Sequence, residues 1–272
     1  MLDYTVTFAT LNCLDYTKQC LESLIQAGTK SNQIVAVDNG STDGTQNYLN
    51  EAGLASAICN KENLSCGVAW NQGILARQSE WTIVMNNDLI VSHQFAERMI
   101  EFAIKNDLKM VSPALVDGSL DYDFNEFASS ASLKMHDVMR IYSTHAVCMC
   151  IHWSVFQEIG FFRATPTLLG FEDTIFFSDI RKYGIKHATT GSVWLHHFGS
   201  VTQEYMKLQR GIPKGKVLLK VNDRKLLGQS WLERKLLRHS LRKAEQNWRN
   251  SEIKQYGMSL HGLRKNSEFH WL

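Results

Sequence analysis

The most constraining feature of this sequence is a regular alternation of short apolar strands and helices over residues 4–112. Such alternation indicates an α/β fold with a mostly parallel sheet covered by helices. Ligands of these sheets bind beyond the carboxyl ends of the strands. Asp38 and Asp88 both follow predicted strands, so we expect both to point into one crevice. The strands are expected at 4–11, 33–38, 55–59, 81–85 and 108–112, and the helices at 15–27, 45–51, 67–78 and 92–105.

The pattern changes after Asp117. Residues 117–139 are polar and irregular and predict a loop or short helices, whereas the chain after Gly199 is basic and helical. We therefore expect one α/β domain over residues 1–200 and a basic helical extension over residues 201–272. Between these parts we expect strands at 145–151 and 192–196 and helices at 153–159 and 172–183.

Charge is distributed unevenly between these two parts. The whole chain has a net charge of +2, but residues 1–200 carry −8 and residues 201–272 carry +10. A basic tail suggests an anionic partner, and a solvated helical surface explains it equally well. Residues 231–248 form a basic amphipathic pattern, whose apolar stripe we expect to pack on its own domain rather than on a membrane.

The six cysteines indicate the compartment. None forms a C-x-x-C pair, and we interpret all six as reduced thiols of a cytoplasmic protein. The N-terminus has neither the basic start nor the apolar stretch of a signal peptide. No apolar run approaches membrane-spanning length, so we expect a protein that is soluble or peripheral to a membrane.

Two acidic turns follow predicted strands. Asp38 closes a strand before the turn 39–45, and a carboxylate there can accept hydrogen bonds from a base imide or a ribose hydroxyl. The alternative is a helix-capping turn. Asp88 ends the segment Asn86-Asn87-Asp88, and its carboxylate can hold a hard divalent cation that also binds substrate phosphates. The alternative there is ordinary Asx turn chemistry.

Two later segments carry groups that suit proton transfer and metal binding. Glu172 and Asp173 open an apolar helix, where acids favour the positive helix end. Such an acid can also deprotonate a hydroxyl nucleophile. His196 and His197 end a strand before a small-residue turn, and an imidazole there can complete a metal site.

In this order, the segments resemble glycosyltransferase family 2, the inverting transferases with the GT-A fold, over roughly residues 3–200. Asn86-Asn87-Asp88 stands in place of the family's Asp-any-Asp metal motif, and Ser65 replaces an expected glycine. The matching stretches are Phe8-Ala9-Thr10-Leu11-Asn12, Asp38-Asn39-Gly40-Ser41-Thr42-Asp43, residues 62–74 with Asn63 and Asn71, residues 146–156, Glu172-Asp173 and residues 196–200.

The resemblance implies a role for each matching position. Asp173 would deprotonate the acceptor hydroxyl, and Glu172 would orient the acceptor or a loop. Asp88 would bind Mn²⁺ or Mg²⁺, with His197 or alternatively His196 as a second ligand. In the nucleotide-sugar site, Asp38 would contact the base, Thr10 would lie beside it, and Asn87 would contact the sugar or ribose. The positions that the resemblance assigns to this site are Thr10, Asn12, Asp38, Asn39, Asn63, Asn71 and Asn87.

The resemblance leaves the acceptor open. We expect an inverting hexosyl- or pentosyltransferase that uses a UDP-sugar and acts on a polysaccharide or lipid-linked oligosaccharide. The alternatives are hydroxymethylated bases in DNA, with the basic tail on phosphates, and a protein side chain. A nucleotide-sugar-binding module without catalysis is a further alternative, because Asn86 and Asn87 depart from the paired-acid motif. A nucleotidyltransferase would need a glycine-rich basic loop after the first strand, which residues 10–17 lack.

Overall fold

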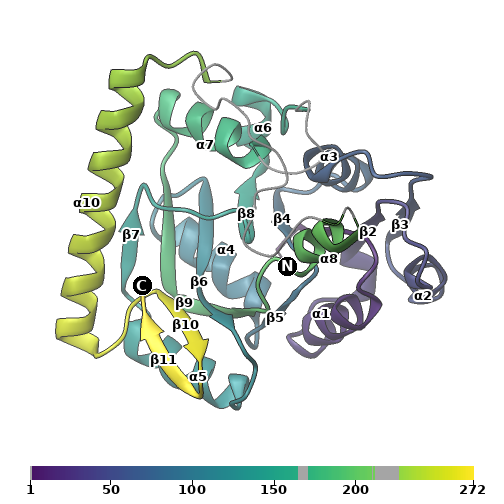
Figure 1. Ribbon diagram of the computed structural model, residues 1–272, viewed down its shortest axis with the longest axis horizontal. Coiled ribbons are helices and arrows are strands. Elements are labelled where there is room, and N and C mark those ends of the chain that lie inside the picture. Colours follow the sequence, from purple (N-terminus) through teal and green to yellow (C-terminus); the bar gives the residue numbers. More distant parts are fainter. Residues whose placement is uncertain (1, 165–170, 210, 212–226) are drawn as a thin grey trace.

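The computed structural model describes residues 2–164, 171–209, 211 and 227–272. In this part of the chain, eleven strands form one curled sheet with helices on both faces (Figure 1). The parallel centre of the sheet has the order β4–β1–β2–β3, which confirms the expected architecture. These strands are β1 (Tyr4–Thr10), β2 (Ile34–Asp38), β3 (Ser56–Cys59) and β4 (Trp81–Met85).

The second half of the sheet mixes strand directions. β8 runs antiparallel between β4 and β6, and β9 runs parallel to β6. β5 and β7 pair antiparallel with β9, while the hairpin β10–β11 joins the sheet through β6. These strands are β5 (Leu89–Val91), β6 (Met110–Gly118), β7 (Met139–Ile141), β8 (Cys148–His152), β9 (His187–His197), β10 (His261–Lys265) and β11 (Glu268–Trp271).

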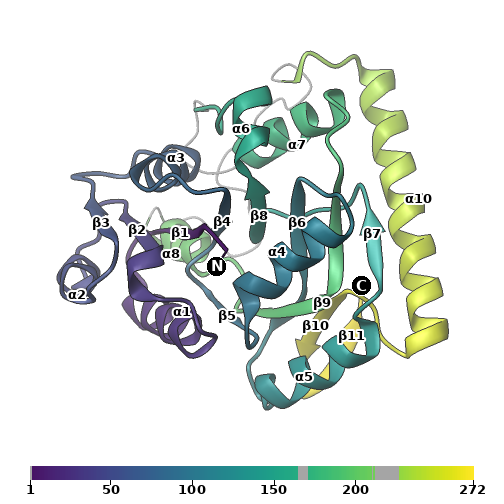
Figure 2. The same ribbon diagram turned by 180° about the vertical axis from the view of Figure 1, so that it is seen from behind.

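Two apolar layers hold the helices on the sheet (Figures 1 and 2). Neighbouring residues of a strand point to opposite faces. Ile83 therefore packs with α1, α2 and α4, whereas Val84 packs with α3, α6 and α7. These helices are α1 (Leu14–Gln26), α2 (Thr45–Glu51), α3 (Cys66–Ala76), α4 (Phe95–Lys105), α6 (Trp153–Ile159) and α7 (Glu172–Lys182), and a short 3₁₀ helix spans Ser31–Gln33.

A third apolar cluster corrects the expectation of a loop or short helices over residues 117–139. This stretch contains α5 (Phe124–Met135), whose first turn is capped by Asp123, which accepts a hydrogen bond from the Glu126 amide (2.9 Å). The buried side of α5 packs on Trp194 of β9 and on residues of the C-terminal hairpin. The stretch looks polar because alanines and serines provide much of the helix, and their apolar periodicity is weak.

The helices after Gly199 are α8 (Val201–Gln209) and α10 (Trp231–Tyr256). Leu237, Leu241 and Trp248 lie on the partly buried side of α10, as expected for packing on the domain. Trp231, Leu232 and Leu236 are exposed, so the apolar stripe packs only in part. Near the far end of α10, Arg140 and Glu252 form a buried bidentate ion pair with N–O distances of 2.8 and 2.6 Å. None of the helices described is both long and apolar enough to cross a membrane.

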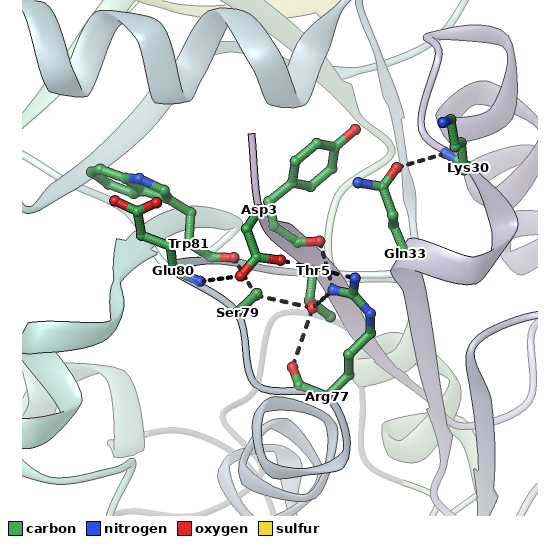
Figure 3. Close-up of polar contacts among 9 residues, drawn as sticks. Asp3, Thr5, Lys30, Gln33, Arg77, Ser79, Glu80 and Trp81 are labelled. Atoms are coloured by element: carbon green, nitrogen blue, oxygen red, sulfur yellow. Dashed lines mark hydrogen bonds and ion pairs between the residues drawn. The ribbon is translucent and has the colours of Figure 1, made fainter. Parts of the chain in front are cut away.

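A polar cluster fixes the amino ends of β1 and β4 (Figure 3). The Arg77 guanidinium donates to the Tyr4 carbonyl (2.8 Å), and the Ser79 hydroxyl donates to Thr5 Oγ1 (3.0 Å). Asp3 accepts a hydrogen bond from the Glu80 amide (3.1 Å). These contacts tie the starts of the two strands together. They help to set the register that places Thr10 and Asp88 at the opposite edge of the sheet.

Candidate functional site

The carboxyl ends of β1 and β4 open into a cavity of about 350 Å³. It lies where sheets of this kind bind ligands. It brings together residues from six of the predicted segments, although these are spread over almost two hundred residues. The lining residues include Thr10, Asn39, Asn63, Asn86, Asn87, Asp88, Glu172, Asp173 and His197.

Asp88 and His197 are neighbours because β5 pairs antiparallel with β9, with Leu89 opposite His197. Both side chains are buried, and Asp88 Oδ1 lies 3.4 Å from His197 Nε2. Asp88 Oδ2 accepts a hydrogen bond from the Val201 amide (3.0 Å) at the start of α8. The backbone carbonyl of Asp88 also accepts a hydrogen bond from the Phe198 amide (3.0 Å). The carboxylate is thus held against the turn that follows β9.

A second carboxylate orients the His197 ring. Asp117 Oδ1 lies 2.7 Å from His197 Nδ1, and Asp117 Oδ2 lies 2.7 Å from His261 Nε2 on β10. Although burial alone would lower it, the contacts with Asp117 and Asp88 raise the pKa of His197 to about 9. Although burial alone would raise it, the hydrogen bonds to both histidines hold the pKa of Asp117 well below its ordinary value. Without a cation, the raised pKa of His197 means that both ring nitrogens carry a proton near pH 7, with Nδ1–H donated to Asp117 and Nε2–H directed at Asp88. A bound cation would take the place of the Nε2 proton.

Asp88 and His197 fit a divalent cation. His197 Nε2 is buried and forms no well-aligned hydrogen bond within the described part of the chain. An oxygen and an imidazole nitrogen facing each other at 3.4 Å are suitable ligands for Mn²⁺. A histidine ligand normally donates its other ring N–H to a carboxylate, as His197 does to Asp117. No group of three or more acidic, histidine or cysteine side chains suited to a metal occurs among the described residues. Asp88 and His197 are therefore the two protein ligands available to a cation in this cavity.

His196 lies on the opposite face of β9, because neighbouring residues of a strand alternate. It is fully buried, and its Nδ1 lies 3.0 Å from the Tyr122 hydroxyl. Burial lowers the pKa of His196 to about 4. It packs among aromatic rings and does not line the cavity, so of the two candidate histidines His197 is the one beside Asp88.

Glu172 and Asp173 enter the cavity from the first turn of α7. Phe171 immediately before them has a φ of 75°, a left-handed conformation that starts the helix sharply. Asp173 is half-buried, and its Oδ1 accepts a hydrogen bond from the Thr174 amide (2.6 Å). Glu172 is buried against Gly67 of α3, where an added Cβ would lie 2.9 Å from the Glu172 Cβ. This close contact fixes the position of α7 relative to α3.

Four of the residues expected at a nucleotide sugar line the cavity: Thr10, Asn39, Asn63 and Asn87. The Asn87 amide donates to Thr10 Oγ1 (3.1 Å) and Thr17 Oγ1 (2.9 Å), so its nitrogen joins β4 to β1 and α1. The Asn39 amide donates to the Ser65 carbonyl (3.1 Å). These contacts leave the side chains fixed at the edge of the cavity.

Three other residues expected at the nucleotide sugar lie outside the cavity lining. Asn12 Oδ1 accepts a hydrogen bond from the Thr42 amide (2.8 Å). Asn71 exchanges two hydrogen bonds with the backbone of Phe162 (2.7 and 3.1 Å). Asp38 is fully buried; its Oδ2 accepts hydrogen bonds from the amides of Gly40 (3.0 Å) and Ser41 (2.9 Å). Asp38 Oδ1 has no partner within the described part of the chain.

Sequence reasoning missed the contribution of α8 to the cavity. Ser200, Thr202, Gln203 and Met206 line it, together with Cys66 and Trp70 of α3. The α8 residues directly follow the histidine turn, and this closeness in the sequence was the only indication that they would line the cavity. Asp117 was also missed, since it lies near His197 only through the pairing of β6 with β9.

The fold resembles that of two known structures of glycosyltransferases. The chain is similar to a crystal structure of GalNAc-T7 with UDP, GalNAc and Mn²⁺ (TM-score 0.57, 14% identity, 73% of this chain and 43% of that one). It is also similar to the mannosyltransferase PcManGT from Pyrobaculum calidifontis in complex with GDP-Man and Mn²⁺ (TM-score 0.55, 15% identity, 77% and 61%). The chain thus spans less than two thirds of the length of either protein.

The family comparison is more direct. No curated protein matches the sequence. The model of glycosyl transferase family 2 matches residues 5–165, which is more than half of the chain and includes β1, Asp38 and Asp88. The sequence motifs, the sheet order and the cavity at the strand ends agree with this match. The chain belongs to glycosyl transferase family 2.

Proposed function

We propose that this chain is an inverting, metal-dependent glycosyltransferase that moves a hexosyl or pentosyl group from a nucleotide sugar to an acceptor hydroxyl. The observation that carries the proposal is the meeting of Asp88, His197, Glu172 and Asp173 around one cavity. The two similar structures named above contain UDP with GalNAc, or GDP-Man, each together with Mn²⁺. We expect UDP-sugars as donors, Mn²⁺ or Mg²⁺ as the cation and the cytoplasm as the compartment.

In this proposal Asp88 Oδ1 and His197 Nε2 hold the cation, and Asp117 fixes the tautomer of the histidine. A cation there would neutralise the charge that develops on the leaving diphosphate. Thr10, Asn39, Asn63 and Asn87 would surround the nucleotide sugar. Asp38 Oδ1 is a buried acceptor without a partner among the described residues, and it would accept an N–H of the base only if the turn that covers it moved.

Asp173 would act as the general base in a single displacement. The acceptor O–H proton passes to the Asp173 carboxylate, and the acceptor oxygen forms a bond to the anomeric carbon. The bond from that carbon to the diphosphate breaks, and its electron pair leaves with the diphosphate. Attack opposite the leaving group inverts the anomeric centre, and no covalent nucleophile is required. Glu172, buried beside Asp173, would position the start of α7 and the acceptor.

A polysaccharide or lipid-linked oligosaccharide is the acceptor that we propose first. The exposed cations of α10 favour DNA with hydroxymethylated bases as a second candidate; they include Lys235, Arg238, Arg242 and Lys243. A DNA acceptor would have to present a flipped base to Asp173. Binding to duplex DNA that weakens steeply with salt, together with transfer to hydroxymethylated duplex, would favour the second candidate over the first.

A thermal-shift screen of nucleoside diphosphates and nucleotide sugars, with Mn²⁺ and with EDTA, tests the donor assignment. A ligand that binds only the folded state raises the melting temperature. We expect UDP and one or more UDP-sugars to stabilise the protein in Mn²⁺, and to lose most of that effect in EDTA. If no nucleotide stabilises the protein under either condition, the proposed donor site is wrong.

A further inference from the structure

A second cavity of about 220 Å³ lies between α7 and α10. Figure 1 shows α10 running alongside the edge of the molecule that carries β7 and α7. The volume of this cavity is below the roughly 300–1,000 Å³ of a pocket that encloses a whole ligand. A cavity of this size suits one group of a larger molecule. The lining residues are Tyr142, Ser143, Thr144, Thr174, Phe177, Arg181, Arg234, Leu241, Glu245 and Trp248, and we call this cavity the α7–α10 groove.

Two arginines from different helices line this groove, Arg181 of α7 and Arg234 of α10. Arg181 is half-buried, and its guanidinium forms no hydrogen bond or ion pair in the part of the chain that the structure describes. Burial and then the nearby charge of Arg234 lower the pKa of Arg181. Glu245 is the one acidic residue that lines the groove, and it is exposed. The guanidinium of Arg181 therefore has no acidic partner among the described lining residues.

Another contact of α10 with the domain, near the far end of this helix, is built differently. There the buried Arg140 is matched by the buried Glu252 in a bidentate pair. Removing a charged group from water is costly unless an opposite charge compensates for it. At the α7–α10 groove no such acid faces Arg181 among the described residues. An anion from outside the chain would supply the missing charge, and the planar guanidinium is suited to phosphate and carboxylate.

The remaining lining suits a sugar beside the anion. Ser143, Thr144 and Thr174 bring hydroxyl groups to the lining, and Trp248 contributes an aromatic surface. The Thr144 hydroxyl also forms a hydrogen bond with the Ser112 hydroxyl (2.7 Å), and the Thr174 hydroxyl donates to Asp173 Oδ1 (3.3 Å). Thr174 directly follows Asp173, which lines the catalytic cavity, so the two cavities adjoin at the first turn of α7. Thr174 and Arg181 are separated by seven residues of α7, or about 10 Å along the helix axis at 1.5 Å per residue.

We propose that the α7–α10 groove binds an anionic group, phosphate or carboxylate, of a glycan acceptor whose reacting hydroxyl lies at Asp173. This inference rests on the proposed function and adds the chemical class of the acceptor. The donor diphosphate is assigned to the other cavity, beside Asp88 and His197. The occupant is a glycan rather than duplex DNA, because the groove has a volume of only about 220 Å³ and the cations that a duplex would meet first lie on the exposed side of α10.

Binding at the groove can be measured without catalysis by following the arginine Nε–H resonances in NMR spectra. Arg181→Gln assigns the Arg181 signal by its loss. Glucose 1-phosphate and glucuronate are the anionic probes, and glucose is the neutral one. We expect saturable shifts of the Arg181 signal with an anionic probe and none with glucose. The tighter of the two anionic probes identifies phosphate or carboxylate as the preferred group.

Matched variants separate the groove from general charge effects. Arg181→Gln should weaken binding of the tighter anionic probe about tenfold or more, measured by isothermal titration in EDTA. Arg181→Lys should give an intermediate loss, since it keeps the charge without the planar fork. Lys182→Gln, on the exposed side of the same turn, should leave the affinity unchanged. Thermal unfolding of each variant verifies that it is folded.

Three results would overturn the proposal: an Arg181 signal that no probe shifts, equal shifts by glucose and the anionic probes, or equal losses in Arg181→Gln and Lys182→Gln. Saturable shifts by a duplex oligonucleotide but not by the sugar probes would reassign the groove to nucleic acid. Hydrolysis of UDP-sugars in Mn²⁺, measured in parallel, tests the proposed function separately. The proposal for the groove can therefore be wrong while the transferase assignment is right, and the transferase assignment can be wrong while the groove binds an anion.

Discussion

At the scale of single residues, Asp88 stands where the family motif has paired acids, and its surroundings account for the difference. The preceding Asn87 uses its amide to join Thr10 and Thr17. In the proposed metal site the second ligand comes instead from the end of β9, where His197 Nε2 lies 3.4 Å from Asp88 Oδ1. A donor diphosphate would add further oxygen ligands. One carboxylate in the motif is therefore compatible with a metal site.

Asp173→Asn tests the proposed base. The amide cannot take a proton from the acceptor, so transfer should fall by about two to four orders of magnitude. The side chain keeps its size and the donor contacts lie elsewhere, so nucleotide affinity measured by calorimetry should be unchanged. Near-normal turnover by this variant would remove Asp173 from the role of base.

Asp117→Asn tests how the histidine is held. Loss of the charged partner of His197 should weaken Mn²⁺ binding by about 10–100-fold, as measured by electron paramagnetic resonance of free Mn²⁺. Asp121→Asn is the matched control, because Asp121 pairs with Arg264 and has no contact with His197. Equal Mn²⁺ affinities of the two variants would show that Asp117 does not position the ligand.

At the scale of elements, the catalytic cavity depends on how closely α7 approaches α3. Gly67 makes that approach possible, because a Cβ there would lie 2.9 Å from the Glu172 Cβ. The first turn of α7 carries Glu172 and Asp173 into one cavity and Thr174 into the adjoining groove. A small displacement of α7 would therefore affect both sites.

Gly67→Ala should lower transfer by roughly ten- to a hundredfold, because it would move Asp173 relative to the donor. Steady-state kinetics and thermal unfolding of the same samples provide the measurement. Leu75→Ala, at an exposed position of the same helix, should retain normal activity. The proposed packing role would be refuted by a Gly67→Ala variant with unchanged turnover.

The elements also mark the limit of what the sequence could predict. β1–β4 and α6 were predictable because apolar runs end at clear turns. The positions of Asp88 and His197 were predictable because each lies at the end of such a run, and that of Asp173 because it opens an apolar helix. The roles of Asp117 and His261 were not, since they depend on β6 pairing with β9 and β10. Asn71 matched a motif, yet its amide holds Phe162, a contact that residue spacing cannot reveal.

At the scale of the whole molecule, the C-terminal hairpin belongs to the sheet that carries the cavity. β10 pairs with β6, and His261 reaches the carboxylate that orients His197. His145 supports the same region from the interior: its Nε2 lies 2.8 Å from the Pro113 carbonyl, and its Nδ1 has no partner among the described residues. Burial lowers the pKa of His145 to about 4.

The half-buried His145, whose Nδ1 is inaccessible to solvent, predicts an acid-sensitive fold. Its folded pKa lies below the unfolded value of about 6.5, so the unfolded chain binds the proton more readily. The stability it contributes is complete above that pH and is lost as the pH falls towards about 4, by about 1.4 kcal/mol for each pKa unit. Urea unfolding between about pH 7.5 and pH 5.5 should show a smaller loss for His145→Gln than for the wild type. If the wild type and His145→Gln lost the same free energy of unfolding over this pH range, His145 would not be the cause of the acid sensitivity.

The central claim is that Asp88 and His197 hold a cation needed for transfer from a nucleotide sugar. The most direct measurement is release of UDP from a panel of UDP-sugars, by wild type, Asp88→Ala and His197→Gln, with Mn²⁺ and with EDTA. We predict release by the wild type in Mn²⁺ only, and a loss of at least about a hundredfold in both variants. Full activity in EDTA, or unchanged activity of Asp88→Ala, would contradict the account.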